Sequence, residues 1–183
     1  MANKAVMSPL SISAMDDRSK VKTFIHTTAD VDNGFVFQKS TLSTDADKSQ
    51  VYTIAAPAAS AGLKNLYMAY TAESNVTVGA DGNQYKIGDL NPQAFTNVAG
   101  AVFNGHRISV GDKIKVTAEA LGGTQSTNTF VVATADTMKL TWAAAAVAGV
   151  SFKLEAESYF SIPQGTIGSQ RVKAFILECV AVA

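Results

Sequence analysis

The sequence has few of the residues that build disulfides, metal sites and acid–base catalysts. It contains one cysteine and two histidines among 183 residues. A lone cysteine cannot close a disulfide within the chain, and neither an HExxH nor a CxxC spacing is present. An EF-hand calcium loop and a Gly-rich phosphate-binding loop are absent as well. We therefore expect no zinc, EF-hand calcium or nucleotide site, and no cofactor.

An excess of charge and long apolar runs are also missing. Fifteen basic and fifteen acidic residues cancel, and the basic ones are scattered from Lys4 to Lys173 without a cluster. Nucleic-acid binding normally requires a basic patch, so we expect no nucleic-acid partner. No apolar run approaches the roughly 20 residues that span a bilayer, and the first 20 residues lack the apolar core of a signal peptide. These absences predict synthesis in the cytosol and no membrane partner.

What the sequence does contain is alternation of apolar and polar residues. In Ile108 to Ala120 the apolar residues share one parity, and Gly111-Asp112 interrupts the pattern as a tight turn or bulge. The stretch Ser151 to Pro163 repeats the alternation, with Phe152, Leu154, Ala156, Phe160 and Ile162 expected on one face. A period of two residues predicts half-buried strands in both stretches.

Many shorter strand candidates lie between turn residues, which predicts an all-β fold, a β-sandwich or barrel of many short antiparallel strands. Asp81-Gly82-Asn83 has the composition of a hairpin turn. The segment from Val172 to Val182 is apolar on both parities, which is typical of a central strand covered on both faces or buried against a partner chain. We assign residues 21–183 to one β-rich domain with room for two sub-lobes.

The residues with the most chemical potential are His26, His106 and Cys179. His26 falls in a strand pattern and His106 in the turn-like FNGHR, and neither has a nucleophile or carboxylate beside it in the sequence. Cys179 sits in the apolar VKAFILECVAVA, where a buried structural role is expected. With no catalytic arrangement to assemble, we predict that the protein is not an enzyme and has no catalytic or metal-binding residues.

Residues 1–20 show no periodicity and are predicted to form an extended N-terminal arm. An apolar but aperiodic segment gains order by docking on a partner. Met7, Leu10 and Ile12 are therefore the candidate docking residues.

Several segments resemble small structural proteins of tailed bacteriophages. They are MANKAV, DVDNGFVF (Asp30 to Phe37), YTIAAPA, SVGDKIKVT and the terminal SYFSIPQG…VKAFILECV. In particular, the chain resembles head decoration or cement proteins. The resemblance implies a virion protein that binds the outer surface of the capsid and stabilises it. It also implies contacts with the major capsid protein and with other copies of the same chain, after synthesis in the host cytoplasm.

Two other readings stay open at this stage. A tail-tube or head-fibre subunit of the same kind of particle would also be β-rich and self-associating. A carbohydrate-binding or adhesion module would need clustered exposed aromatic residues, whereas the aromatic residues here fall inside strand patterns.

Overall fold

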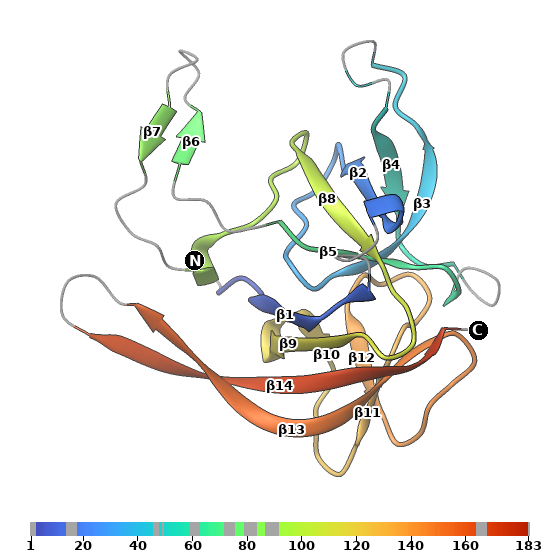
Figure 1. Ribbon diagram of the computed structural model, residues 1–183, viewed down its shortest axis with the longest axis vertical. Coiled ribbons are helices and arrows are strands. Elements are labelled where there is room, and N and C mark those ends of the chain that lie inside the picture. Colours follow the sequence, from blue (N-terminus) through green and yellow to red (C-terminus); the bar gives the residue numbers. More distant parts are fainter. Residues whose placement is uncertain are drawn as a thin grey trace.

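The computed structural model is all-β, as the alternation predicts (Figure 1). A closed barrel lies against one face of a seven-stranded sheet, and a small two-stranded hairpin stands apart from both. The structure describes residues 3–13, 18–45, 48, 50–58, 63–71, 76–78, 84–86, 92–163 and 168–182.

The seven-stranded sheet combines the N-terminal segment with the second half of the chain. Its neighbours are antiparallel except for the short parallel pair β10 and β12. In spatial order the strands are β1 (Met7–Ser11), β9 (Lys113–Thr117), β14 (Ser169–Val182), β13 (Val150–Pro163), β11 (Phe130–Val132), β12 (Leu140–Ala143) and β10 (Leu121–Gly122).

The barrel uses the first half of the chain. Its one parallel contact joins β2 and β4, and its other neighbours are antiparallel. In order around the barrel the strands are β2 (Val21–Ile25), β4 (Tyr52–Ala55), β3 (Val36–Leu42), β5 (Tyr67–Ala69) and β8 (Val102–Arg107). In the described part of the chain, the 3₁₀ turns η1 (Arg18–Lys20), η4 (Pro92–Ala94) and η5 (Ala118–Ala120) connect strands.

The predicted hairpin around Asp81-Gly82-Asn83 is partly described. β6 (Val76–Val78) and β7 (Gln84–Lys86) pair antiparallel, which is the pairing that the turn sequence predicts. The three turn residues themselves lie outside the described residues.

Aromatic rings fill the barrel. The Phe24 and Phe37 rings meet edge to face with centroids 4.9 Å apart, and Tyr67 and Phe103 pack around them. Gly105 makes room for this cluster, because a Cβ there would lie 2.5 Å from Phe24 Cε2 and 2.8 Å from Phe37 Cζ. The interior of this small barrel is therefore a packed core.

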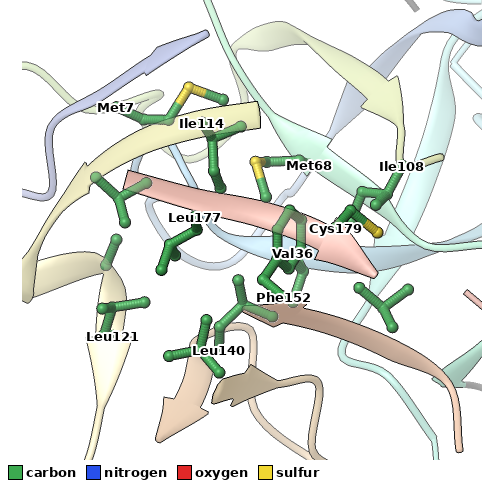
Figure 2. Packing of buried hydrophobic residues seen from close by; sticks show 14 of the residues in the cluster. Met7, Val36, Met68, Ile108, Ile114, Leu121, Leu140, Phe152, Leu177 and Cys179 are labelled. Carbon is green, nitrogen blue, oxygen red and sulfur yellow. The ribbon is translucent and has the colours of Figure 1, made fainter. Parts of the chain in front are cut away.

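A second core joins the barrel to the sheet. Figure 2 shows Val36 and Met68, from β3 and β5, among Phe152, Leu177 and Cys179 of the sheet. These side chains belong to one cluster of buried residues, so the two sheets share apolar surface. Burial of this kind contributes about 25 cal/mol per Å² of apolar area. The barrel and the seven-stranded sheet therefore stabilise each other.

The predicted strand is confirmed as β13, but its apolar side chains do not all lie on one face as predicted. The register with β14 shifts between Leu154 and Ala156, so Glu155 is an extra residue. Residues opposite each other in an antiparallel pair share a face, and one extra residue exchanges the faces of all later side chains. Leu154 pairs with Leu177, which faces the shared core, whereas Phe160 pairs with Val172 on the other face. Ala156 and Ile162 lie on the same face as Phe160.

The N-terminal arm is not confirmed. Residues 7–11 form β1, which pairs with β9 at the edge of the sheet. Met7 and Ile12 are buried in the shared core, and Val6 exchanges backbone and side-chain hydrogen bonds with Thr117. The segment lacks periodicity because its burial does not alternate: it passes from buried Met7 to exposed Leu10 and Ser11, and a bulge lies between Pro9 and Ser11. Removing residues 1–20 would delete a strand of the sheet, and so could not test an arm alone.

Substitution of Gly105 by alanine tests the packing of the barrel. The new methyl group would overlap Phe24 and Phe37, and overpacking of a core costs about 1–3 kcal/mol. We expect the Gly105→Ala variant to unfold at lower denaturant concentration than the native protein. Asn104→Ala, at the exposed neighbouring position of β8, is the control and should unfold close to the native midpoint. Equal midpoints for all three proteins would contradict the packing described here.

Candidate interaction surface

The two histidines have no catalytic partners in the described part of the chain. His26 Nδ1 lies 2.8 Å from the Ala29 carbonyl oxygen and 3.0 Å from Ala29 N. The hydrogen-bond partner of the ring is therefore the backbone only three residues further along the chain. His106 is buried within β8, which corrects the prediction that it lies in a turn. Within the described residues, no three His, Cys, Asp or Glu side chains gather as a metal site would require.

One buried carboxylate organises the corner where the barrel chain enters the sheet. Asp112 Oδ1 accepts a hydrogen bond from Ser13 N at 2.8 Å, and its Oδ2 accepts one from Ser109 N at 2.7 Å. Gly111 N donates to the Cys179 carbonyl, and Cys179 N donates to the Asp112 carbonyl, both at 2.8 Å. Gly111 has φ of 90°, a conformation that glycine adopts without strain. The predicted Gly111-Asp112 interruption is thus a turn that ties three segments together.

Three exposed apolar side chains lie on the segments that this turn joins, and we call them the apolar corner. They are Val110, 60% exposed, Leu10, 50% exposed, and Val180, 39% exposed. Val110 is inside the turn, Leu10 precedes Ser11, which pairs with Lys113, and Val180 follows Cys179. Exposed apolar residues that occur singly need no explanation, whereas three of them on segments held together by one hydrogen-bonded turn make this region a candidate interaction site.

The structure separates the three predicted docking residues. Leu10 is exposed and belongs to the apolar corner, whereas Met7 and Ile12 are buried within this same chain. Buried side chains cannot contact a partner unless the sheet opens. Sequence reasoning missed Val110 and Val180, because hydrogen bonds between remote segments bring the turn at Gly111-Asp112 to β14.

The edges of the seven-stranded sheet are poorly suited to pairing with another chain. β1 carries Pro9 and a bulge, and both features disrupt the ladder of an edge strand. β10, at the other edge, has two residues. Short or irregular edges protect a sheet against uncontrolled addition of strands. Specific contacts with a partner are therefore expected from side chains rather than from strand addition.

The distal part of the β13–β14 hairpin extends beyond β1 and β9 (Figure 1). Arg171 lies over the ring of the exposed Tyr159, 4.4 Å from its centroid, and Lys173 Nζ lies 2.9 Å from Glu157 Oε1. The hydrogen bond from Lys173 lowers the pKa of Glu157. All four side chains are on the face that points toward the barrel side, as their pairing shows. Exposed ion pairs add little stability, so their arrangement shapes the surface more than it supports the fold.

The opposite face of the sheet carries a further charged group. Lys113 Nζ lies 3.0 Å from both carboxylate oxygens of Glu155 and 3.5 Å from Glu178 Oε2. The hydrogen bond with Glu155 raises the pKa of Lys113. The bulge residue Glu155 is thus held across two strands by a lysine of β9. This face presents paired charges to solvent beside the apolar corner.

A cleft of about 430 Å³ opens at the end of the barrel where β2 and β4 separate. The two strands pair only at Phe24 with Tyr52 and at Ile25 with Thr53, so the chain before these residues diverges. Lys39 Nζ lies over the Tyr52 ring, 4.4 Å from its centroid. The cleft is lined by Val21, Lys22, Thr23, Leu42, Gln50 and Tyr52. Its mixture of hydroxyl, amide and aromatic groups suits a polar ligand.

No family model, curated protein or solved structure matches this chain. Among the residues that the structure describes, no helix is long and apolar enough to cross a membrane. Function therefore has to be inferred from the residues and their geometry.

Cys179 is buried in the shared core, as its apolar surroundings predict. Burial raises the pKa of its thiol to about 12. At pH 8 the reactive thiolate is then on the order of one in ten thousand molecules, because each pH unit below the pKa lowers it tenfold. We expect iodoacetamide to alkylate the folded protein about a thousandfold more slowly than the protein in guanidinium. Equal rates in a sample whose circular dichroism remains native would contradict this burial.

Proposed function

We propose that this chain is a structural protein of a bacteriophage particle that binds the outer surface of the capsid and stabilises it. The observation that carries the proposal is the apolar corner, in which Leu10, Val110 and Val180 are exposed on segments fixed by the Asp112 turn. A capsid-binding protein needs complementary surface rather than a reaction centre. The resemblance of the sequence to head decoration proteins supports the same role.

The major capsid protein is the partner in this proposal, and the capsid surface is the place of action. Full burial of an aliphatic side chain contributes about 1.5–3 kcal/mol, so three such residues give a modest contact per copy. A capsid repeats the same site many times, and contacts between neighbouring copies of the chain add to each attachment. Modest contacts therefore suffice when they are made across a whole lattice.

Charged substitutions in the apolar corner test this proposal. We expect Leu10→Asp and Val110→Asp each to weaken binding to purified capsids at least about tenfold, because an unpaired carboxylate must be desolvated at the interface. Binding is measured by co-sedimentation over a range of protein concentrations. Val98→Asp is the matched control, since Val98 is 55% exposed but lies in the turn before β8, and it should bind like the native protein.

The outcomes separate the proposal from its nearest alternative. Thermal unfolding of each variant shows whether the fold is retained, so that a loss of binding can be assigned to the surface. Mass spectrometry of purified particles should give a copy number that is a simple fraction of that of the major capsid protein. If both corner variants bound capsids as tightly as the native protein, the apolar corner would not be the capsid-binding surface. Rings or tubes formed by the purified chain, with no binding to capsids, would favour a tail-tube subunit, and attachment at a few sites per particle would favour a head fibre.

The cleft at the end of the barrel favours a second candidate, a carbohydrate-binding or adhesion module. Its volume of about 430 Å³ is in the range of small-ligand sites, and sugars combine hydroxyl groups with an apolar ring face. Thr23 and Gln50 offer a hydroxyl and an amide for hydrogen bonds, and Tyr52 offers an aromatic ring.

Under this second candidate, Thr23→Ala and Gln50→Ala should each weaken the binding of a glycan identified on an array. Loss of one hydrogen bond to a ligand costs about 0.5–1.5 kcal/mol, which corresponds to a two- to tenfold weaker affinity. Isothermal titration calorimetry measures the change, with Asn104→Ala on β8 as the control outside the cleft. An array with no bound glycan would eliminate the candidate.

A further inference from the structure

A small cavity lies where the barrel meets the seven-stranded sheet, and two polar side chains face it. Its volume is about 10 Å³, close to the space that one water molecule occupies by this measure. His106 of β8 and Asp112 of the turn supply the polar lining. The remaining walls are formed by Ile12, Met68, Arg107, Ile108, Ile114 and Phe152. Residues of the barrel, the sheet and the N-terminal segment thus line the cavity together.

The hydrogen bonds of His106 define what it can bind. Its ring hydrogen-bonds to the backbone of Tyr70, and its Nδ1 is buried with no hydrogen-bond partner among the described residues. The bond to Tyr70 is therefore made by Nε2, whose N–H donates to the backbone carbonyl. In the neutral ring Nδ1 then carries a lone pair and requires a donor. A buried acceptor without a donor costs about 1–3 kcal/mol.

The Asp112 carboxylate has room for one more donor. Each of its oxygens accepts one backbone N–H, from Ser13 and from Ser109, and a carboxylate accepts about four hydrogen bonds in total. A water molecule has two O–H groups, which match one acceptor on His106 and one on Asp112. Buried waters typically make such bonds between otherwise unsatisfied polar groups.

We propose that this cavity binds one water molecule, which donates hydrogen bonds to His106 Nδ1 and to the Asp112 carboxylate, and that proton uptake by His106 loosens the joint between barrel and sheet because the ring must then carry a charge at a buried position. A protonated ring has N–H groups on both nitrogens, so the water then accepts from Nδ1 and still donates to Asp112. The cost of protonation is therefore the burial of the positive charge and not the loss of a hydrogen bond. The inference is independent of capsid binding.

The groups around His106 determine the direction of the pH dependence. Burial lowers the pKa of His106, and this effect exceeds the opposing effects of the Tyr70 hydrogen bond and of the Asp112 charge. Arg107 also lines the cavity, but its guanidinium donates a hydrogen bond to Asn65 at an exposed site, and the centroid of the Tyr70 ring lies 5.8 Å from that of His106. The Cys179 thiol, with its pKa of about 12, is neutral near pH 7.

A histidine with a lowered pKa binds protons more tightly in the unfolded chain than in the folded one. Its contribution to stability is therefore complete above the unfolded pKa of about 6.5 and is lost as the pH falls from there toward the folded pKa. The equilibrium constant for unfolding should rise by up to about tenfold for each pH unit within this window. Below the folded pKa this contribution no longer changes.

Denaturant unfolding at several pH values from 8 to 5 tests the role of His106. We expect the native protein and the His26→Gln control to lose stability below about pH 6.5, and the His106→Gln variant to show a much smaller loss. The same loss in His106→Gln as in the native protein would overturn the proposal. If His106→Gln does not fold, an NMR titration of the native protein replaces it. The His106 ring signals should then titrate below the ordinary histidine pKa of about 6.5, and titration above that value would overturn the proposal.

Two further measurements test the water and the joint. A crystal structure at pH 7.5 should show one ordered water within hydrogen-bond distance of His106 Nδ1, and a cavity without density would overturn that part. Hydrogen exchange, corrected for the intrinsic effect of pH, should become faster at pH 5.5 in segments that contain Ile12, Met68 and Ile114. In His106→Gln the exchange in these segments should not change with pH. Acceleration spread evenly over the whole chain would show that the joint is not the site of opening.

Discussion

The Asp112 carboxylate is buried where the chain passes from the barrel into the sheet, and the geometry of that corner depends on it. A buried carboxylate is costly unless hydrogen bonds replace its lost hydration. Here the replacement comes from backbone N–H groups of Ser13 and Ser109, which belong to segments far apart in the sequence. The cost of burying the charge thereby fixes the relative positions of the N-terminal segment and the turn. Cys179 adds β14 to the same corner through two backbone hydrogen bonds.

The shared core, like this hydrogen-bonded corner, holds the barrel and the sheet together. Val36 and Met68 from the barrel pack with Phe152 and Leu177 of the sheet, and Met7 of β1 extends the cluster (Figure 2). A barrel of five short strands has an interior filled by a few aromatic rings, and one face of the sheet would be exposed without it. Each part therefore covers apolar surface of the other. Small domains gain stability in proportion to the surface that they bury, so the joint contributes to both parts.

Local patterns in the sequence were sufficient to predict the all-β class, the strand at Ser151 to Pro163, the turn at Gly111-Asp112 and the burial of Cys179. Each of these depends on neighbouring residues. The bulge at Glu155 was not predictable, because an alternating sequence is equally compatible with a regular strand and the shift is defined by the register with β14. The burial of Met7 and the joining of the Asp112 turn to the N-terminal segment and to β14 depend on contacts between remote segments, which leave no periodic signal. The candidate surface was therefore predicted only at Leu10.

The replacement of a flexible arm by a fixed corner changes how binding would work. A disordered arm must lose conformational entropy when it docks, at about 1–2 kcal/mol for each ordered residue of backbone. In this fold the segment around Leu10 is already ordered by β9 and by the Asp112 carboxylate, so that cost has been met during folding. A small apolar contact then retains most of its binding free energy. In the proposed role on a repeating lattice, such preorganised contacts would gain their strength from their number, because each attached copy adds to the total.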